Sequence, residues 1–281
     1  MIEGKASQTA RGAAQARAAH QILDKGAIFD DPTALAILGQ SEQEIHDFLA
    51  SNPNPWEQAM RMFMAGRSRF AEDNLNRAMK KGVRQYVVLG AGLDTFAIRN
   101  PYPDSRLKVF EVDHPDTQAW KRNLLSENKL TATAIFTPVD FERQDLAEEL
   151  VRAGFDFRAP ACFSWLGVVM YLTRAATDAT LRVIGALPEN SAVTFDYMAQ
   201  PLTPGQTEFY NAFANAVGPM GEPAGPTNAP DDLAARLSSF GFTDIQDYSL
   251  ENLLPELGAG DSWPRIDDVV FRVAQARKAR R

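Results

Sequence analysis

Short apolar runs alternate with longer mixed segments through the middle of the chain. The expected strands occupy 85–89, 107–112, 134–139, 161–166 and 192–195, and the expected helices between them occupy 115–128, 142–153 and 173–187. Strands that alternate with helices predict an α/β fold with a doubly wound, mostly parallel sheet.

The first 82 residues have a helical pattern instead. An Ala-, Gln- and Arg-rich segment predicts a helix over 6–25, and Asp31-Pro32 is typical of a helix start with Asp31 as the cap. A long helix is expected over 57–80, because lysines and Gly82 follow it as a stop signal. We expect 1–82 to form a helical cap with a lead-in helix, and 83–281 to form the core of a single structural domain.

The segment 198–230 interrupts this alternation. It contains six prolines and a predicted helix over 205–217, and irregular segments of this length are typically lids or binding segments. A passive surface insertion remains the alternative. Two closing strands are expected over 243–250 and 267–275, and they predict a hairpin with an antiparallel edge, which brings the sheet to seven strands.

Composition narrows the function classes. The net charge of −7 disfavours nucleic acid as a partner, and the basic cluster at 277–281 is expected to be a solvated tail. No run of about 18 apolar residues and no signal-peptide pattern is present, so we expect no membrane span and a cytoplasmic location. Cys162 is the single cysteine and lies in an apolar run, which predicts a core residue and excludes an intrachain disulfide.

A glycine-rich turn follows the first strand directly. Gly90, Ala91 and Gly92 allow a sharp turn and close approach of a ligand, and a helix is expected to start there with free N–H groups. A dinucleotide fingerprint requires a third glycine, but Thr95 occupies that position. Asp94 would also repel a pyrophosphate, whereas it suits the ammonium and sulfonium groups of S-adenosylmethionine. These features together favour S-adenosylmethionine as the cofactor.

Acidic residues end the next two strands. Glu111 and Asp113 lie at the end of the second strand, where a carboxylate can accept hydrogen bonds from ribose hydroxyls. Asp140 follows the third strand and can bind the adenine amino group while Phe141 packs on the ring. Equally, Asp140 can simply cap the helix that follows.

Three segments together resemble the leucine carboxyl methyltransferase-like family, which includes bacterial polyketide O-methyltransferases of the tetracenomycin type. They are 87–95, 110–115 and 165–172, and further similarity lies at 7–19, 30–32 and 66–70. The resemblance covers nearly the whole chain. It implies a class I methyltransferase fold, in which seven strands form a mostly parallel sheet with a reversed edge hairpin.

The resemblance also implies residue roles. Arg67 matches the arginine that pairs with the methionine carboxylate of the cofactor, and Gly90 lies under the methionine part. Asp113 matches the ribose contact with Glu111 adjacent, and Asp140 with Phe141 matches the adenine pair.

Two departures from the family pattern imply a different acceptor. Leu166-Gly167 stands where many members have Glu-Gly, and Phe96 stands where many have Arg, although Arg99 is kept.

The acceptor side is less defined. Tyr171 follows the fourth strand and is the best candidate to orient an acceptor oxygen, with Asp196-Tyr197 in a similar place after the fifth. His20 is a weaker candidate for a general base, and His114 is expected to brace the cofactor loop. No metal site is predicted.

We expect O-methylation of a small-molecule carboxylate or hydroxyl. The alternatives are a non-catalytic cofactor-binding protein, a protein carboxyl methyltransferase and a nicotinamide oxidoreductase, and the sequence does not indicate the oligomeric state.

Overall fold

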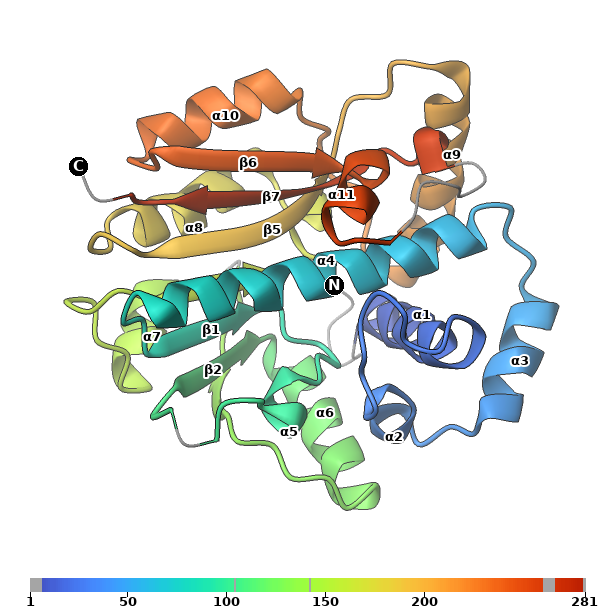
Figure 1. Ribbon diagram of the computed structural model, residues 1–281, viewed down its shortest axis with the longest axis horizontal. Coiled ribbons are helices and arrows are strands. Elements are labelled where there is room, and N and C mark those ends of the chain that lie inside the picture. Colours follow the sequence, from blue (N-terminus) through green and yellow to red (C-terminus); the bar gives the residue numbers. More distant parts are fainter. Residues whose placement is uncertain (1–6, 104, 142, 260–265, 280–281) are drawn as a thin grey trace.

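In the computed structural model one seven-stranded sheet forms the centre of the molecule (Figure 1), and the structure describes residues 7–103, 105–141, 143–259 and 266–279. The strands are β1 (Gln85–Leu89), β2 (Lys108–Asp113), β3 (Ile135–Pro138), β4 (Cys162–Trp165), β5 (Ala192–Met198), β6 (Asp244–Ser249) and β7 (Phe271–Arg277). Their order is β3-β2-β1-β4-β5-β7-β6, with β7 antiparallel to both of its neighbours. The order reverses between β1 and β4, and ligands bind doubly wound sheets at such a reversal.

Helices cover both faces of the sheet. They are α1 (Gln8–Leu23), α2 (Ala34–Leu38), α3 (Glu42–Ser51), α4 (Glu57–Lys80), α5 (Phe96–Arg99), α6 (Pro115–Glu127), α7 (Leu146–Arg152), α8 (Arg174–Gly185), α9 (Pro204–Val217), α10 (Pro230–Ser239) and α11 (Leu250–Glu256). Alternate β1 side chains point to opposite faces. Val87 and Leu89 share a core with residues of α7, α8 and α10, whereas Tyr86 and Val88 pack with residues of α4 and α5.

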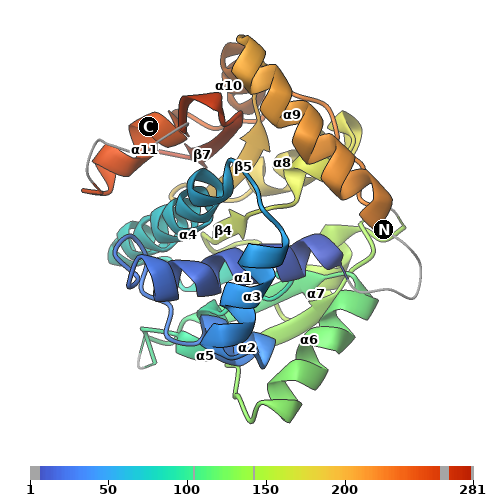
Figure 2. The ribbon, with the colours of Figure 1, turned by 90° about the vertical axis from the view of Figure 1, so that its right-hand side faces the viewer.

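The N-terminal helices and α9 lie beyond one end of the sheet. In Figure 1 the arrows of β1 and β5 point toward this end, and Figure 2 shows α1, α3 and α9 together on that side. Helix α1 packs against α4 and α2. The segments expected to form a cap and a lid therefore both lie at the carboxyl ends of the parallel strands.

The structure confirms the predicted fold class and most of its elements. Helix α4 and strand β1 have the predicted bounds, and the other central strands and helices agree at their cores. Cys162 is buried in β4, and burial raises the pKa of its thiol to about 12, which fits the expected core role. Within the described ranges, no helix has both the length and the hydropathy needed to cross a membrane.

Three local expectations were confirmed only in part. Helix α2 begins later than expected, at Ala34 after Thr33, but the Asp31 carboxylate still accepts from the Thr33 N–H at 3.2 Å and so caps the turn that leads into the helix. Strands β6 and β7 form the expected antiparallel edge, but α11 lies between them in place of a simple hairpin turn. The basic segment at the C-terminus is not a solvated tail up to residue 278: Arg277 ends β7 and pairs with Asp244, and the Lys278 Nζ donates to the carbonyl of Gly185 at 2.7 Å. Residues 280–281 lie outside the described residues.

Candidate functional site

A cavity of about 1700 Å³ opens beyond the carboxyl ends of the parallel strands. This volume exceeds the roughly 300–1,000 Å³ of a typical small-molecule site, so two ligands fit side by side. One part, called here the loop half, is lined by 88–94, 113–116, Val139, Asp140, Phe141, Arg143 and Gln144. The other part, the α9 half, is lined by Trp56, Met60, Met64, Met170, Tyr171, Phe209, Phe213, Met220 and Phe271.

The glycine-rich turn is held between two neighbouring segments. Gly90 and Gly92 have φ angles of +63° and +46°, a region that favours glycine. A Cβ at position 90 would lie 2.2 Å from Val168 Cγ2, and a Cβ at position 92 would lie 2.9 Å from the Cβ of Ala10 in α1. The predicted need for glycine is therefore steric as well as conformational.

The end of the turn differs from the expectation. Helix α5 has only four residues, so the helix N-terminus that was expected to face a ligand is a single turn. Asp94 lines the cavity, and its Oδ1 accepts a hydrogen bond from the Phe96 N–H at 2.8 Å. Charge at this end of the loop comes from the Asp94 carboxylate more than from helix N–H groups.

Asp113 is bonded directly to the glycine turn. Its Oδ2 accepts from the Gly92 N–H at 2.5 Å, and its Oδ1 accepts from the His114 N–H at 2.7 Å. Burial raises the pKa of Asp113 to about 6, and the two amides oppose that rise. The His114 ring caps α6 by accepting from the Asp116 N–H at 3.3 Å, which is a different contact from the expected bracing of the cofactor loop.

Asp140 and Phe141 both line the loop half. The alternative that Asp140 merely caps the following helix was wrong, because α7 begins at Leu146 and its cap is Asp145. The Asp140 carbonyl instead accepts from the N–H groups of Arg143 and Gln144, which forms a turn. This turn leaves the Asp140 carboxylate 3.6 Å from the side chain of Arg143 at the cavity edge.

Glu111 does not reach the cavity, which corrects the expectation that it lies on the ribose side. Its side chain is buried, and the Lys121 Nζ contacts its carboxylate at 2.6 Å and the Asp94 carbonyl at 2.7 Å. Burial raises the pKa of Glu111 to about 7, although the Lys121 charge opposes this. Through Lys121, Glu111 supports the loop from behind.

Arg67 projects from α4 into the cavity wall. Its guanidinium pairs with Asp196, which is fully buried and also accepts from the Gly167 N–H at 2.6 Å. The Arg67 Nε is buried without a hydrogen-bond partner among the described residues. A buried donor without a partner is costly, so this group is suited to an anionic ligand.

His20 was expected to be a possible base, and the geometry contradicts this. The ring is fully buried and does not line the cavity. Its Nδ1 contacts Asp24 at 2.9 Å, and its Nε2 faces the N–H groups of Ile28 and Phe29 at 3.2 and 3.3 Å. Both ring nitrogens therefore stabilise the turn after α1.

Of the aromatic candidates, Tyr171 reaches the cavity. It stacks on Phe213 with a centroid distance of 6.2 Å. Burial raises the pKa of its hydroxyl well above 10, opposed by a hydrogen bond with Thr9. Tyr197 points away, because its hydroxyl donates to Asp247 at 2.5 Å, and Trp165 is buried in the core.

Three lining residues were not predicted from the sequence. Arg17 donates from α1 to the Leu93 carbonyl at 2.6 Å, and the Thr9 hydroxyl donates to Glu222 at 2.5 Å. The alanines Ala14 and Ala18 flank Arg17 on the buried face of α1, and that pattern was the available signal. Thr9 and Glu222 are more than 200 positions apart, and no local pattern links them.

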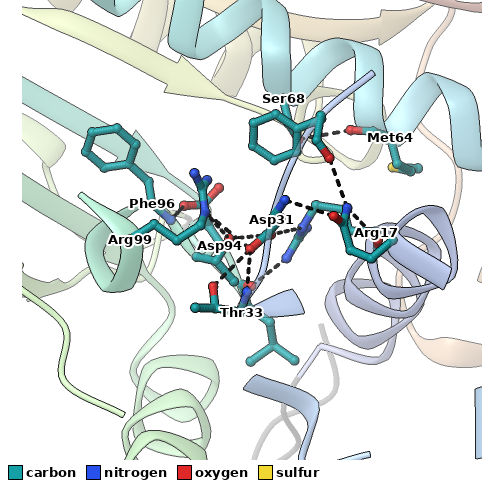
Figure 3. Close-up of polar contacts among 12 residues, drawn as sticks. Arg17, Asp31, Thr33, Met64, Ser68, Asp94, Phe96 and Arg99 are labelled. Atoms are coloured by element: carbon teal, nitrogen blue, oxygen red, sulfur yellow. Dashed lines mark hydrogen bonds and ion pairs between the residues drawn. The ribbon is translucent and has the colours of Figure 1, made fainter. Parts of the chain in front are cut away.

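A buried polar network joins the N-terminal segment to the glycine turn (Figure 3). Asp31 accepts from the Thr95 hydroxyl at 2.6 Å and lies 3.2 Å from Arg99 and 3.6 Å from Arg17. Arg99 also pairs with Glu72 at 2.5 Å. Removing one member would leave a buried charge unpaired, so the cap and the turn are expected to be ordered together.

No cluster of three or more His, Cys, Asp or Glu side chains suited to a metal ion occurs in the described part of the chain. The polar groups of the loop half instead suit a ligand with hydroxyls, an amine and a carboxylate. The α9 half suits an apolar body.

Comparison with known proteins gives a consistent result. The family model of the leucine carboxyl methyltransferases matches residues 10–185. The candidate S-adenosyl-L-methionine-dependent methyltransferase YktD of Bacillus subtilis (strain 168) is 32% identical over 72% of this chain and 74% of its own length. A candidate of the same description from Mycolicibacterium gilvum (strain PYR-GCK) is 34% identical over 74% of this chain and 65% of its own length.

Solved structures show the same fold. A methyltransferase candidate from Thermobifida fusca superimposes with a TM-score of 0.61 at 18% identity, over 88% of this chain and 93% of its own. A DUF574 family protein from Streptomyces avermitilis superimposes with a TM-score of 0.62 at 15% identity, over 99% of this chain and 100% of its own.

Proposed function

This chain belongs to the leucine carboxyl methyltransferase family and is an S-adenosylmethionine-dependent methyltransferase, and we propose that it methylates an oxygen atom of a small, largely apolar acceptor. One observation carries the proposal. A single cavity joins a polar loop half, which carries the glycine turn, to an aromatic α9 half. A donor and an acceptor bound in the two halves would meet inside it.

The residues of the loop half fit the cofactor. The glycine turn leaves no room for a Cβ, and Arg67 has a buried donor available for an anion. We assign the methionine carboxylate to Arg67 with Arg17 nearby, and the methionine part to Gly90. Asp113 is assigned to the ribose.

The adenine end is assigned to Asp140 and Phe141. The carboxylate accepts from the adenine amino group, and the phenyl ring packs on the base. Both residues line the loop half next to Val139, where β3 ends.

The chain itself contributes binding and orientation. The bound cofactor supplies a methyl group already activated by a sulfonium. Much of the rate enhancement would come from holding the acceptor oxygen about 3 Å from the methyl carbon, in line with the methyl group and the sulfur. Tyr171, at the boundary with the aromatic wall, is placed to orient that oxygen through its hydroxyl.

A small acceptor is favoured over a protein side chain. The α9 half is bordered by α9, α4 and the segment after α9, and its lining is mostly aromatic and apolar, which suits an apolar molecule. A cofactor-binding protein without catalysis would not need such a second compartment.

Calorimetry with S-adenosylhomocysteine and NAD tests this function. We expect saturable one-to-one binding of S-adenosylhomocysteine and no heat from NAD. Methyl transfer is then measured with labelled S-adenosylmethionine and a set of apolar acids and phenols. Binding of NAD alone would refute the proposal, and cofactor binding without transfer to any acceptor would favour the non-catalytic alternative.

A further inference from the structure

One carboxylate in the cavity is not explained by cofactor binding. Glu222 follows α9, lines the cavity and is partly buried. Its partner in the structure is the Thr9 hydroxyl, at 2.5 Å, and no cation lies within ion-pair distance of it in the described ranges. Glu57, another lining carboxylate, is by contrast paired with Arg61.

Glu222 lies close to the proposed acceptor position. Thr9 hydrogen-bonds to both Glu222 and Tyr171, so one hydroxyl links the two side chains. Ala10, the next residue, packs against the glycine turn at Gly92. The carboxylate is therefore held near the boundary between the two halves of the cavity, where donor and acceptor would meet.

The charges around the cavity are unevenly distributed. The described arginines that line it are Arg17, Arg67 and Arg143, and each already contacts a loop-half carbonyl or a carboxylate. Arg67 is close enough to the α9 half for its charge to act on Tyr171, but it is already paired with Asp196. An acceptor carboxylate would therefore enter an apolar compartment beside Glu222 without an unpaired cation, which is unfavourable.

The walls of the α9 half suit a planar ring. Phe213 is stacked with Tyr171 and meets Phe271 edge-on with centroids 5.1 Å apart. Phe209 meets Trp56 edge-on at 5.5 Å. Such an arrangement offers both faces and edges to an aromatic guest.

Building on the proposed methyltransferase function, we propose that the acceptor is an uncharged aromatic hydroxyl compound and that Glu222 accepts its proton. The acceptor O–H proton passes to the Glu222 carboxylate. The oxygen forms a bond to the methyl carbon, and the electrons of the broken C–S bond stay on sulfur, which leaves neutral S-adenosylhomocysteine. Glu222 then returns the proton to solvent.

The test uses two matched probes, 2-naphthol and 2-naphthoic acid, with the full-length protein saturated with S-adenosylhomocysteine. At neutral pH the first is uncharged and the second is an anion of similar shape. We expect the naphthol to bind at least about tenfold more tightly. Tighter or equal binding of the naphthoate, or no binding of either probe, would overturn the inference.

Two variants separate charge from structure. Glu222→Gln keeps an acceptor for the Thr9 hydroxyl but loses the charge and the base, so the preference for naphthol should fall at least fivefold. Thr9→Val removes the hydrogen bond but keeps the carboxylate, so the preference should persist. An equal loss of preference in both variants would show that Glu222 only holds the segment in place.

Turnover supplies an independent readout. If naphthol is methylated, Glu222→Gln should lower kcat by about a hundredfold, the lower range for a general base. The defect should shrink for a nitro-substituted phenol that is already ionised in the assay. Glu208→Gln, the same change on the exposed side of α9, is the control. It should leave both the binding preference for naphthol and kcat unchanged.

The outcomes also separate the two proposals. If S-adenosylhomocysteine does not bind, the methyltransferase proposal fails. If it binds but naphthoate is preferred, only the inference about Glu222 and the acceptor fails.

Discussion

The loop half and the α9 half of the cavity are assembled from different parts of the chain. The loop half comes from three strand ends within about 55 residues of one another, each marked by a short motif at Gly90, Asp113 or Asp140. The α9 half combines α4, the turn after β4, α9 and β7, which are distant in sequence. The first is defined by local motifs, whereas the second is defined by side-chain size and charge at places that only the fold brings together.

The sharpest test of this division is Arg67→Ala. It should weaken S-adenosylhomocysteine binding at least tenfold, because the methionine carboxylate loses its cation. It should also lower the free energy of unfolding by about 3 kcal/mol, because Asp196 is left buried and unpaired. Calorimetry and denaturant titration measure the two effects.

The control for this variant is Arg69→Ala, two residues along the same helix. Arg69 is 45% exposed and pairs with Asp73 at the surface, so both quantities should change little. An unchanged cofactor affinity in Arg67→Ala would remove Arg67 from the binding site.

A smaller loss is expected from Gly90→Ala. Its Cβ would meet Val168, and its φ is positive, so cofactor affinity should fall about tenfold and the free energy of unfolding by about 2 kcal/mol. Gly82→Ala, also at positive φ but with open space around it, should cost about 1 kcal/mol and leave affinity unchanged. Adding Val168→Ala to Gly90→Ala should restore part of the loss; no restoration would argue against a steric cause.

The pH dependence of cofactor binding should report on Asp113. Its pKa of about 6 means that the carboxylate is mostly protonated at pH 5, so affinity should fall about tenfold between pH 7 and pH 5. In Asp113→Asn the affinity should be lower at pH 7 and nearly flat with pH. A wild-type profile that stays flat would contradict the ribose assignment.

The same pKa values affect stability in the opposite direction. Asp113 and Glu111 titrate near 6 and 7 in the folded protein, above their ordinary values of 3.8 and 4.5. Their contribution to the free energy of unfolding is therefore fully present below pH 4 and is lost as pH rises through 6 and 7. Denaturant titrations at a series of pH values measure this. The free energy of unfolding should change with pH by a different slope in wild type and in Asp113→Asn between about pH 4 and pH 7.

The smallest effect on the cofactor is expected from Phe213→Ala in the α9 half. Cofactor affinity should stay within about twofold, while the affinity for an aromatic acceptor should fall, because the ring loses a stacking partner. Titration of both ligands measures this. A large loss of cofactor affinity would show that the two halves are not separate sites.

Much of the fold was predictable because its signals are local. The bounds of α4 follow from a long helical pattern with a lysine and glycine stop, and β1 is a short apolar run bounded by glycine. The glycine turn, Asp113 and Asp140 could be placed because strand ends of a parallel sheet meet at one edge.

The errors concern side chains whose partners are set by packing. Glu111 lies two residues from Asp113 on β2, but its carboxylate pairs with Lys121 on α6 and therefore does not line the cavity. The Nε2 atom of His20 faces the backbone N–H groups of Ile28 and Phe29 in the turn after α1. The helical pattern around His20 gives no sign of that turn. Glu222 depends on Thr9, from the other end of the chain, and such a contact exists only in the folded protein.

A crystal structure of the complex with S-adenosylhomocysteine would locate the cofactor directly. We expect the methionine carboxylate at Arg67, the ribose at Asp113, the adenine between Asp140 and Phe141, and the sulfur facing Tyr171 across an open α9 half. A cofactor whose adenine occupies the α9 half, or which binds outside the cavity, would refute the assignment of the loop half as the cofactor site.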